Sequence, residues 1–183
     1  MNLRQRIFRR RANRQPARTK KFRNYYQVNT ILIIFESDYM ERNDMIQSFI
    51  YQLKTDGKDV EAWGYVENKD STTSSIRPFR TIGRKDVNLF HVPRKSALAD
   101  MAHDKYDLIL DLRLRPCVPL QYLTLNTDAD LKAGADLACD SHFNRILDFM
   151  IKLPEHEGEP TEEDVKLLYD DLIHYLKVIK END

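Results

Sequence analysis

Four polar residues near the ends of predicted strands are the first candidates for chemistry in this sequence. Asp38 and Asp111 each follow an apolar run, Arg113 comes two residues after Asp111, and His91 lies near the end of a third strand-like segment. A carboxylate there could act as a base or hold a metal ion, and an arginine suits an anionic ligand such as phosphate. Asp38, His91, Asp111 and Arg113 are therefore the predicted ligand-binding residues, and none of them is assigned a catalytic role.

Two of these positions also have a purely structural explanation. Asp38 lies just before a predicted helix, where Asp and Ser cap the first turn. Asp111 can pair with Arg113 or Arg115, or it can cap the turn that follows its strand. A fold alone does not supply a function, so the structural explanation is favoured for both aspartates.

The sequence predicts neither a cofactor nor a metal site. Its five glycines are scattered, and none opens a helix directly after a strand, as nucleotide-binding loops require. The segment CDSH, from Cys139 to His142, contains metal-binding residue types, but a structural zinc site needs four ligands and no second pair lies at matching spacing. Cys117 is the only other cysteine, so no disulfide framework is expected and a reducing cytoplasm fits best.

The amino-terminal arm, residues 1–27, has the strongest functional signal. Residues 1–35 contain ten Lys or Arg and no acid, whereas the rest of the chain carries a net charge of −10. Leu3, Ile7 and Phe8 are spaced as on a short helix that would end before Pro16. The arginines predicted to contact an anionic partner are Arg4, Arg6, Arg9, Arg10, Arg11 and Arg14.

Three interpretations of this arm stay open at this point. Its cations and aromatic residues could bind RNA phosphates and stack on bases. Its apolar positions could instead dip into an anionic membrane surface. It could also be a solvated tail, or it could pack on the acidic body of its own chain. Composition does not separate these three interpretations.

The remaining sequence alternates strand signals with helix signals. Continuous apolar runs and alternating segments predict strands, and apolar positions at helical spacing predict helices. Strands are expected at residues 30–35, 59–66, 87–92, 106–112 and 129–136, with a short edge strand within 76–83. Helices are expected at residues 45–53, 94–103, 119–126 and 161–179. Residues 144–154 fit either element, and a strand is favoured because the run is short and Pro154 ends it.

This alternation predicts an α/β fold, with a single open, mostly parallel, doubly wound (Rossmann-like) sheet and helices on both faces. The basic arm would precede one domain, residues 28–183, which ends in an amphipathic helix that begins with a partial capping box at Thr161 and Asp164. Ligands bind such sheets beyond the carboxyl ends of the strands, where the four candidate residues are expected. No apolar run has the length of a membrane span or of a secretory signal.

Two resemblances bear on the fold. Residues 106–136 resemble the amino-terminal half of heptosyltransferase-type glycosyltransferases, with Asp111, Leu112 and Gly134 at the ends of two strands. The basic arm, ILIIFESD, YDLILDL and LKAG together resemble a family of small cytosolic proteins from Bacteroidetes that has no known function. The first resemblance implies the fold and no activity, because those enzymes hold the nucleotide-sugar with a second Rossmann-like half. The second brings no known activity with it.

The predicted function is therefore a non-enzymatic cytoplasmic domain whose arm docks on an anionic partner, either RNA or a membrane surface. A membrane partner would make the protein peripheral at the inner membrane. The alternative is an enzyme or small-ligand binder related to the amino-terminal half of glycosyltransferases. The positions of Asp38, His91, Asp111 and Arg113 separate the two hypotheses, because a small-ligand site needs them around one pocket.

Overall fold

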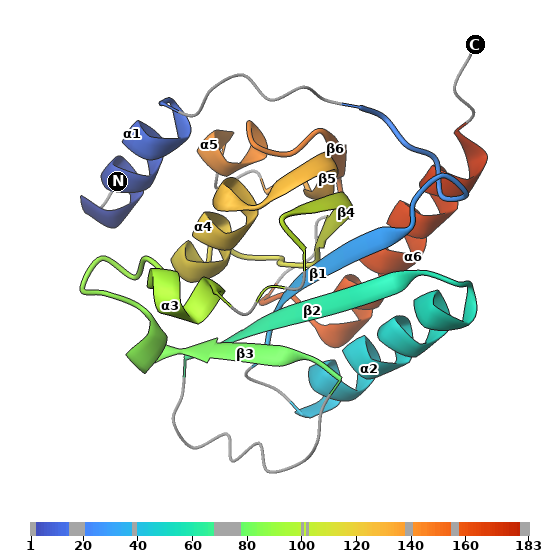
Figure 1. Cartoon of the computed structure of the whole chain (residues 1–183), viewed down its shortest axis with the longest axis horizontal. Coiled ribbons are helices and arrows are strands. Elements are labelled where there is room, and N and C mark those ends of the chain that lie inside the picture. The colour runs from blue at the N-terminus through green and yellow to red at the C-terminus, as the bar shows by residue number, and fades with distance from the viewer. Residues whose placement is uncertain are drawn as a thin grey trace.

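Six parallel strands form one open sheet at the centre of the molecule (Figure 1). The computed structural model describes residues 3–14, 21–37, 40–67, 78–99, 101, 103–137, 141–154 and 158–179. The strands are β1 (Thr30–Glu36), β2 (Asp59–Val66), β3 (Arg80–Gly83), β4 (Lys105–Asp111), β5 (Asp128–Ala135) and β6 (Phe149–Ile151). The predicted ligand residue Asp38 and the Cys139 of CDSH lie outside the described residues.

The strand order is β3-β2-β1-β4-β5-β6, and every neighbouring pair is parallel. This is the order of dinucleotide-binding doubly wound sheets, in which the winding direction reverses between β1 and β4. The predicted α/β class is confirmed, and the sheet is wholly parallel rather than mostly parallel. The carboxyl ends of β1 and β4 therefore define the edge at which such folds bind ligands.

The helices cover both faces of this sheet. They are α1 (Leu3–Ala12), α2 (Met40–Thr55), α3 (Lys95–Leu98), α4 (Val118–Asn126), α5 (Ser141–Asn144) and α6 (Glu162–Val178), with a 3-10 turn, η1 (Arg84–Asp86). α2 and α6 share one apolar core with the sheet, and α3 and α4 contribute to the core on the opposite face. α1 packs on the outer side of α4 (Figure 1).

The central strand β1 explains why its sequence is apolar without interruption. Successive side chains of a strand point to opposite faces. Ile31, Ile33 and Phe35 therefore enter the core beneath α2 and α6, whereas Leu32 and Ile34 enter the core beneath α3 and α4. All five are fully buried, as the continuous run TILIIF predicts for a strand covered on both sides.

Helix α6 begins as the sequence predicts. The Thr161 hydroxyl accepts a hydrogen bond from the Asp164 N–H, and the Thr161 N–H donates to the Asp164 carboxylate at 2.7 Å. An aspartate thus completes the capping box that usually contains Glu or Gln. Gly57, just beyond α2, has a φ of +79°, which is the left-handed conformation that favours glycine after a helix.

The structure corrects three expected elements. Residues 87–92 are not a strand: only Val87 and Pro93 form an isolated antiparallel bridge, and the residues between them make a turn. The helix expected at 94–103 is limited to the four residues of α3. The ambiguous segment 144–154 contains the end of α5 and then the short strand β6, so the favoured strand is confirmed only over Phe149–Ile151.

Candidate functional site

The carboxyl end of β4 holds a buried ion pair. The Asp111 carboxylate accepts two hydrogen bonds from the Arg113 guanidinium, each at 2.7 Å, and both residues are 1% exposed. The Thr124 hydroxyl donates to Asp111 at 2.6 Å, and Arg113 also donates to the Cys117 carbonyl. The Phe143 ring covers the guanidinium, with its centroid 4.0 Å from the central carbon. Every strong hydrogen-bonding group of the pair is thus engaged inside the protein.

The aspartate partner stabilises the charge of Arg113. Burial alone would lower the pKa of Arg113, but the charge and hydrogen bonds of Asp111 outweigh it and the pKa of Arg113 is raised. Gly134 of β5 lies opposite Asp111 in the sheet, and a Cβ atom at Gly134 would lie 2.8 Å from the Asp111 carbonyl oxygen. The glycine therefore permits the close strand approach that seals the pair from one side. Two of the four predicted ligand residues are joined here, and neither is accessible to solvent.

A second charged cluster lies at the end of β1. Glu36 is 4% exposed and accepts a hydrogen bond from Arg115, while Arg42 lies 3.9 Å from the same carboxylate oxygen. Arg42 also donates to Glu162 at 2.9 Å, which connects α2 to the start of α6. Burial raises the pKa of Glu36, although Arg115, Arg42 and Arg113 oppose this shift.

The space enclosed by this second cluster is small. The cavity lined by Glu36, Arg42 and Arg115 is about 20 Å³, which is little more than the space that one water molecule occupies. Among the described residues, these ion pairs occupy the switch point between β1 and β4, and the cavity that they line is too small for a larger ligand. Sequence reasoning named Arg115 here, but Arg42 and Glu162 come from other elements and carry no local motif that would identify them.

His91 does not follow a strand end, contrary to the reasoning that selected it. It lies in the turn before α3 and has a φ of +59°. Its neighbour Val92 is buried in a cluster with Tyr122 and Phe143, on the face of the sheet covered by α4. Asp38 lies outside the described residues, and of the three described candidates Asp111 and Arg113 are in direct contact.

A wider cleft lies beside the closed switch point, beyond the ends of β5 and β6. Its volume is about 340 Å³, and its polar lining consists mainly of Asp136, Lys152 and Asp164 around the apolar Leu114 and Leu153. This position agrees with the carboxyl-edge rule for parallel sheets. It is the place at this edge of the described chain where a small molecule would have room.

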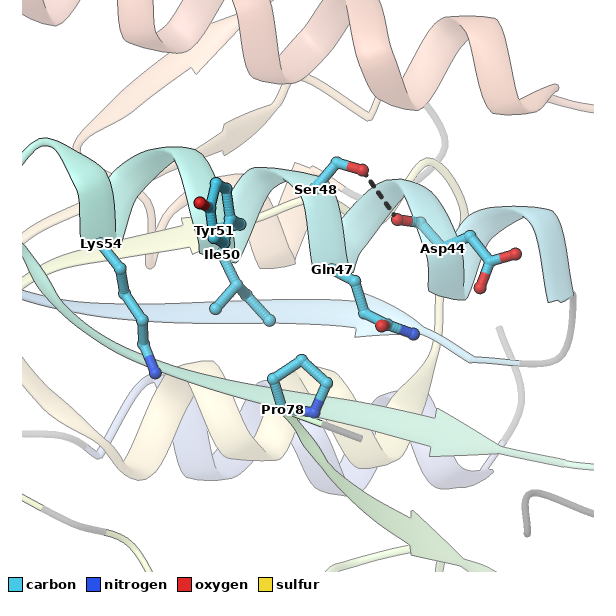
Figure 2. A pocket seen from close by; sticks show the side chains of 7 residues that line it. All are labelled: Asp44, Gln47, Ser48, Ile50, Tyr51, Lys54 and Pro78. Atoms are coloured by element: carbon cyan, nitrogen blue, oxygen red, sulfur yellow. Dashed lines mark hydrogen bonds between the residues drawn. The ribbon is translucent and has the colours of Figure 1, made fainter. Parts of the chain in front are cut away.

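A cleft on the α2 side brings no reactive side chains together among the described residues. It measures about 540 Å³ and lies between α2 and Pro78. Figure 2 shows Lys54, Ile50 and Gln47 reaching from α2 toward Pro78, while the Ser48 hydroxyl donates to the Asp44 carbonyl of its own helix. A hydroxyl bonded to its own helix is not an activated nucleophile, and we assign no role to this cleft.

Cys117 provides a test of the closed switch point. Burial raises the pKa of its thiol to about 12, although Arg113 and the Leu120 N–H oppose this shift. Only the thiolate reacts with alkylating agents. We therefore expect iodoacetamide at about pH 8, near the pKa of an ordinary thiol, to leave Cys117 unmodified in the folded protein and to modify it in denaturant. Peptide mapping by mass spectrometry would separate Cys117 from Cys139, and rapid native labelling of Cys117 would contradict the prediction.

The amino-terminal helix α1 is held on the body of the protein by one aromatic residue. Phe8 is 2% exposed, and its ring meets the Tyr122 ring of α4 edge-on at a centroid distance of 5.2 Å. The Arg11 guanidinium lies over the Tyr122 ring, 5.4 Å from its centroid. The described side chains of α1 and its following turn that remain exposed are mostly arginines: Arg6, Arg10, Arg11 and Arg14. The side chains of Arg4 and Arg9 lie outside the description.

The carboxyl end of the predicted arm is also fastened to the body. The Arg23 guanidinium donates to the Asp130 carboxylate at 2.6 Å and lies 3.5 Å from Asp107. Tyr25 is 4% exposed, and its N–H donates to the Leu176 carbonyl of α6 at 2.8 Å. These contacts tie residues 21–27 to the amino-terminal edge of the sheet, so removing residues 1–27 would also remove part of the core.

The sheet separates two helical faces of opposite charge. Helices α1, α3, α4 and α5 with η1 contain eight Lys or Arg and a single acid, Asp86. Helices α2 and α6, on the other face, contain four Lys or Arg and seven Asp or Glu. Asp86 is engaged locally, because its carboxylate accepts a hydrogen bond from the Gly83 N–H at 2.9 Å. We call the surface formed by α1, η1 and α3 the basic face.

Comparison with known proteins assigns a family and no activity. The chain belongs to a family of unknown function, DUF6913, whose model matches residues 2–179. Neither a curated protein nor a solved structure matches the chain. None of the helices that the structure describes is long and apolar enough to cross a lipid bilayer. The described residues also include no group of three or more His, Cys, Asp or Glu side chains placed to hold a metal ion.

Proposed function

We propose that this member of the DUF6913 family is a non-enzymatic docking domain whose basic face binds a phosphate-bearing polyanion, either RNA or the surface of an anionic membrane. The observation that carries this proposal is the orientation of α1. Its aromatic anchor Phe8 is buried on α4, and Arg6 and Arg10 are exposed to solvent. The partner would be met in the cytoplasm, or at the inner face of its membrane if it is a bilayer.

This orientation favours contact through charge rather than insertion of the helix. Of the three apolar positions predicted to dip into a bilayer, Phe8 is buried and Ile7 is only part-exposed. Phe8 is therefore occupied by its contact with α4. The helix can offer arginines to phosphates while it stays attached to the body, and arginine forks match phosphate oxygens well.

The free helix surface also carries unfavourable charge repulsion. Arg6 and Arg10 are four residues apart on α1, the helix contains no acid, and no acid of the described chain pairs with either side chain. A like-charge pair at this spacing destabilises a helix by about 0.2–0.5 kcal/mol. A bound polyanion would remove this repulsion and add an attraction of about 1 kcal/mol per cation at an anionic surface.

Neutralising two arginines of α1 tests the proposal. We expect Arg6→Gln with Arg10→Gln to weaken binding about 30-fold, which corresponds to about 2 kcal/mol for two cations. Glutamine is a good helix former, so α1 should keep its structure. Binding would be measured against single-stranded RNA by fluorescence anisotropy and against phosphatidylserine vesicles by co-flotation, at several salt concentrations. With RNA, the slope of log affinity against log salt should become shallower by about 1.4.

A matched control removes the same charge from the opposite face. Lys54→Gln with Lys166→Gln deletes two exposed cations from α2 and α6, and it should leave binding to either probe within about twofold. Equal losses in both double variants would show that net charge alone matters. That result, or the absence of binding by the unmodified protein to both probes, would overturn the proposal.

A second candidate function is small-ligand binding at the carboxyl edge of the sheet. It is favoured by the strand order and by the cleft of about 340 Å³ beside Asp136 and Lys152. Asp111 and Arg113 would then support the edge from beneath rather than touch the ligand, because both are buried. The glycosyltransferase resemblance suggests nucleotide-sugars as the first compounds for a thermal-shift screen. A stabilisation that is lost in Lys152→Ala would support this function, and no shift with any compound would remove its basis.

A further inference from the structure

The turn between η1 and α3 exposes two large apolar residues. Leu89 is 91% exposed and Phe90 is 45% exposed, and they are adjacent at the outermost point of the turn. We call residues 88–91 the apolar tip. Single exposed apolar residues are common on protein surfaces. A nearly fully exposed leucine beside an exposed phenylalanine needs a specific explanation when the backbone is held in place. The hydrogen bonds of the turn hold it in this way.

The backbone of the apolar tip is closely fixed. The His91 N–H donates to the Asn88 carbonyl at 2.8 Å, and the Asn88 N–H donates to the Val92 carbonyl at 3.0 Å. The Asn88 side chain accepts two further bonds, from the N–H groups of Phe90 and Val92, at 2.9 and 3.1 Å. His91 adopts the left-handed conformation, as the residue after a tight hairpin turn often does. The turn therefore presents Leu89 and Phe90 on a preformed support.

The base of the turn is tied to the protein on both sides. The Arg94 N–H donates to the Asp86 carbonyl at 2.8 Å, beside the bridge between Val87 and Pro93. Val92 is 9% exposed and packs in the same apolar cluster as Phe8 of α1. Figure 1 shows this loop, in light green before α3, extending outward on the same side of the molecule as α1. The tip and the arginines of α1 thus belong to one face.

Cations flank the apolar tip on both sides in the sequence. Arg84 and Lys85 precede it and Arg94 and Lys95 follow it, and all four side chains are exposed. The only acid in residues 78–99 is Asp86, whose carboxylate is engaged by the Gly83 N–H. Apolar side chains at the outermost point with cations behind them match the order of layers in an anionic bilayer, where acyl chains lie beneath negatively charged headgroups.

We infer that the partner of the basic face is an anionic lipid bilayer, and that Leu89 and Phe90 insert among the acyl chains while the flanking cations and the α1 arginines bind headgroup phosphates. This inference rests on the proposed function and specifies its partner. RNA is disfavoured because base stacking would use Phe90 and would leave Leu89 without an apolar environment. The tip provides an apolar contribution to binding that the buried Phe8 of α1 does not supply.

The first test replaces the tip and keeps every charge. Leu89→Ser with Phe90→Ser in the full chain should reduce partitioning onto phosphatidylserine-containing vesicles by about 100-fold or more, because two apolar side chains no longer enter the acyl chains. Binding to single-stranded RNA should be unchanged. Neither side chain contributes to the core, so thermal unfolding should be the same as in the unmodified protein, and circular dichroism would check this.

The second test reports insertion directly. Trp63 is the only tryptophan and is 3% exposed, so its emission provides a constant background. In Phe90→Trp, added anionic vesicles should shift the emission to shorter wavelength, and lipids with brominated acyl chains should quench it. Tyr51→Trp is the matched control, because Tyr51 is 76% exposed on α2, on the opposite face, and should show neither effect. Vesicles of phosphatidylcholine alone should give a much smaller response.

Each alternative outcome has a definite meaning. If the serine variant binds vesicles normally while the Arg6 and Arg10 variant does not, the proposed function stands and the bilayer insertion is wrong. If RNA binds and anionic vesicles do not, the inference is also wrong and the polyanion is a nucleic acid. If the unmodified protein forms a dimer that the serine variant converts to a monomer, the tip is a self-association contact and the inference fails.

Discussion

Replacing Asp111 with alanine is expected to lower the free energy of unfolding by about 3–5 kcal/mol, because removal of one partner leaves the other charge buried and unpaired. The remaining charge would be that of Arg113, which is 1% exposed and lies against Phe143. Thr124 would also lose the carboxylate to which its hydroxyl donates. Urea denaturation followed by circular dichroism would measure the change, and a shift in the midpoint with an unchanged slope would identify a loss of stability.

A double variant separates the pair from its individual charges. Asp111→Leu with Arg113→Met replaces both ions with apolar side chains, and such replacements of buried ion pairs are often neutral or stabilising. We therefore expect this variant to be much more stable than Asp111→Ala. If Asp111→Ala unfolds like the unmodified protein, the carboxylate is not the necessary partner of Arg113. If Asp111→Ala is stable and a small molecule no longer binds, the aspartate has a ligand role instead.

Replacing Phe8 with alanine should release α1 from the body of the protein. Removal of a buried phenylalanine ring costs about 3–5 kcal/mol, and Phe8 is the most buried described side chain of α1. A ten-residue helix has little stability of its own in water. Hydrogen exchange of residues 3–12 should therefore become much faster, with little change in the strands. Binding to polyanions should also weaken, because the arginines lose their fixed arrangement.

The other ring of this contact provides the control. The Tyr122 hydroxyl is buried and has no hydrogen-bond partner among the described residues. Tyr122→Phe keeps the ring against Phe8 and removes an unsatisfied polar group, so it should leave α1 docked and should not destabilise the protein. Fast exchange of α1 in Tyr122→Phe, or slow exchange in Phe8→Ala, would show that this aromatic pair does not hold the helix.

The tip residues illustrate why the sequence misled the prediction of one element. VNLFHV is a short segment of mostly apolar residues, which is typical of a strand. In the structure, the Asn88 side chain accepts two backbone N–H groups, and these bonds close a turn instead of extending a ladder. Asn88 and Pro93 were the available signals, since both residue types favour turns. The turn depends on hydrogen bonds of the Asn88 side chain, which a count of apolar residues in the segment does not reveal.

The candidate ligand residues show a similar limit at the carboxyl edge. The sequence predicted that Asp111 would lie at the end of a buried strand near arginines, and both parts are confirmed. It left open whether the carboxylate would face a ligand or Arg113. Thr124 of α4 and Phe143 of α5 decide this by closing over the pair from distant parts of the chain. Contacts between residues so far apart in the chain cannot be predicted from residue spacing in the sequence.

The sequence by itself determined the α/β class, the capping of α6 and the uneven distribution of charge along the chain. Those features follow from local periodicity, from side chains that bond within one turn and from counting residues. Only the tertiary structure decided which side of α1 faces solvent, because that depends on a contact between Phe8 and Tyr122, which are far apart in the chain. Burial of the Phe8 ring fixes the direction in which the charges of α1 are exposed. The basic arm therefore forms an arginine surface beside the apolar tip.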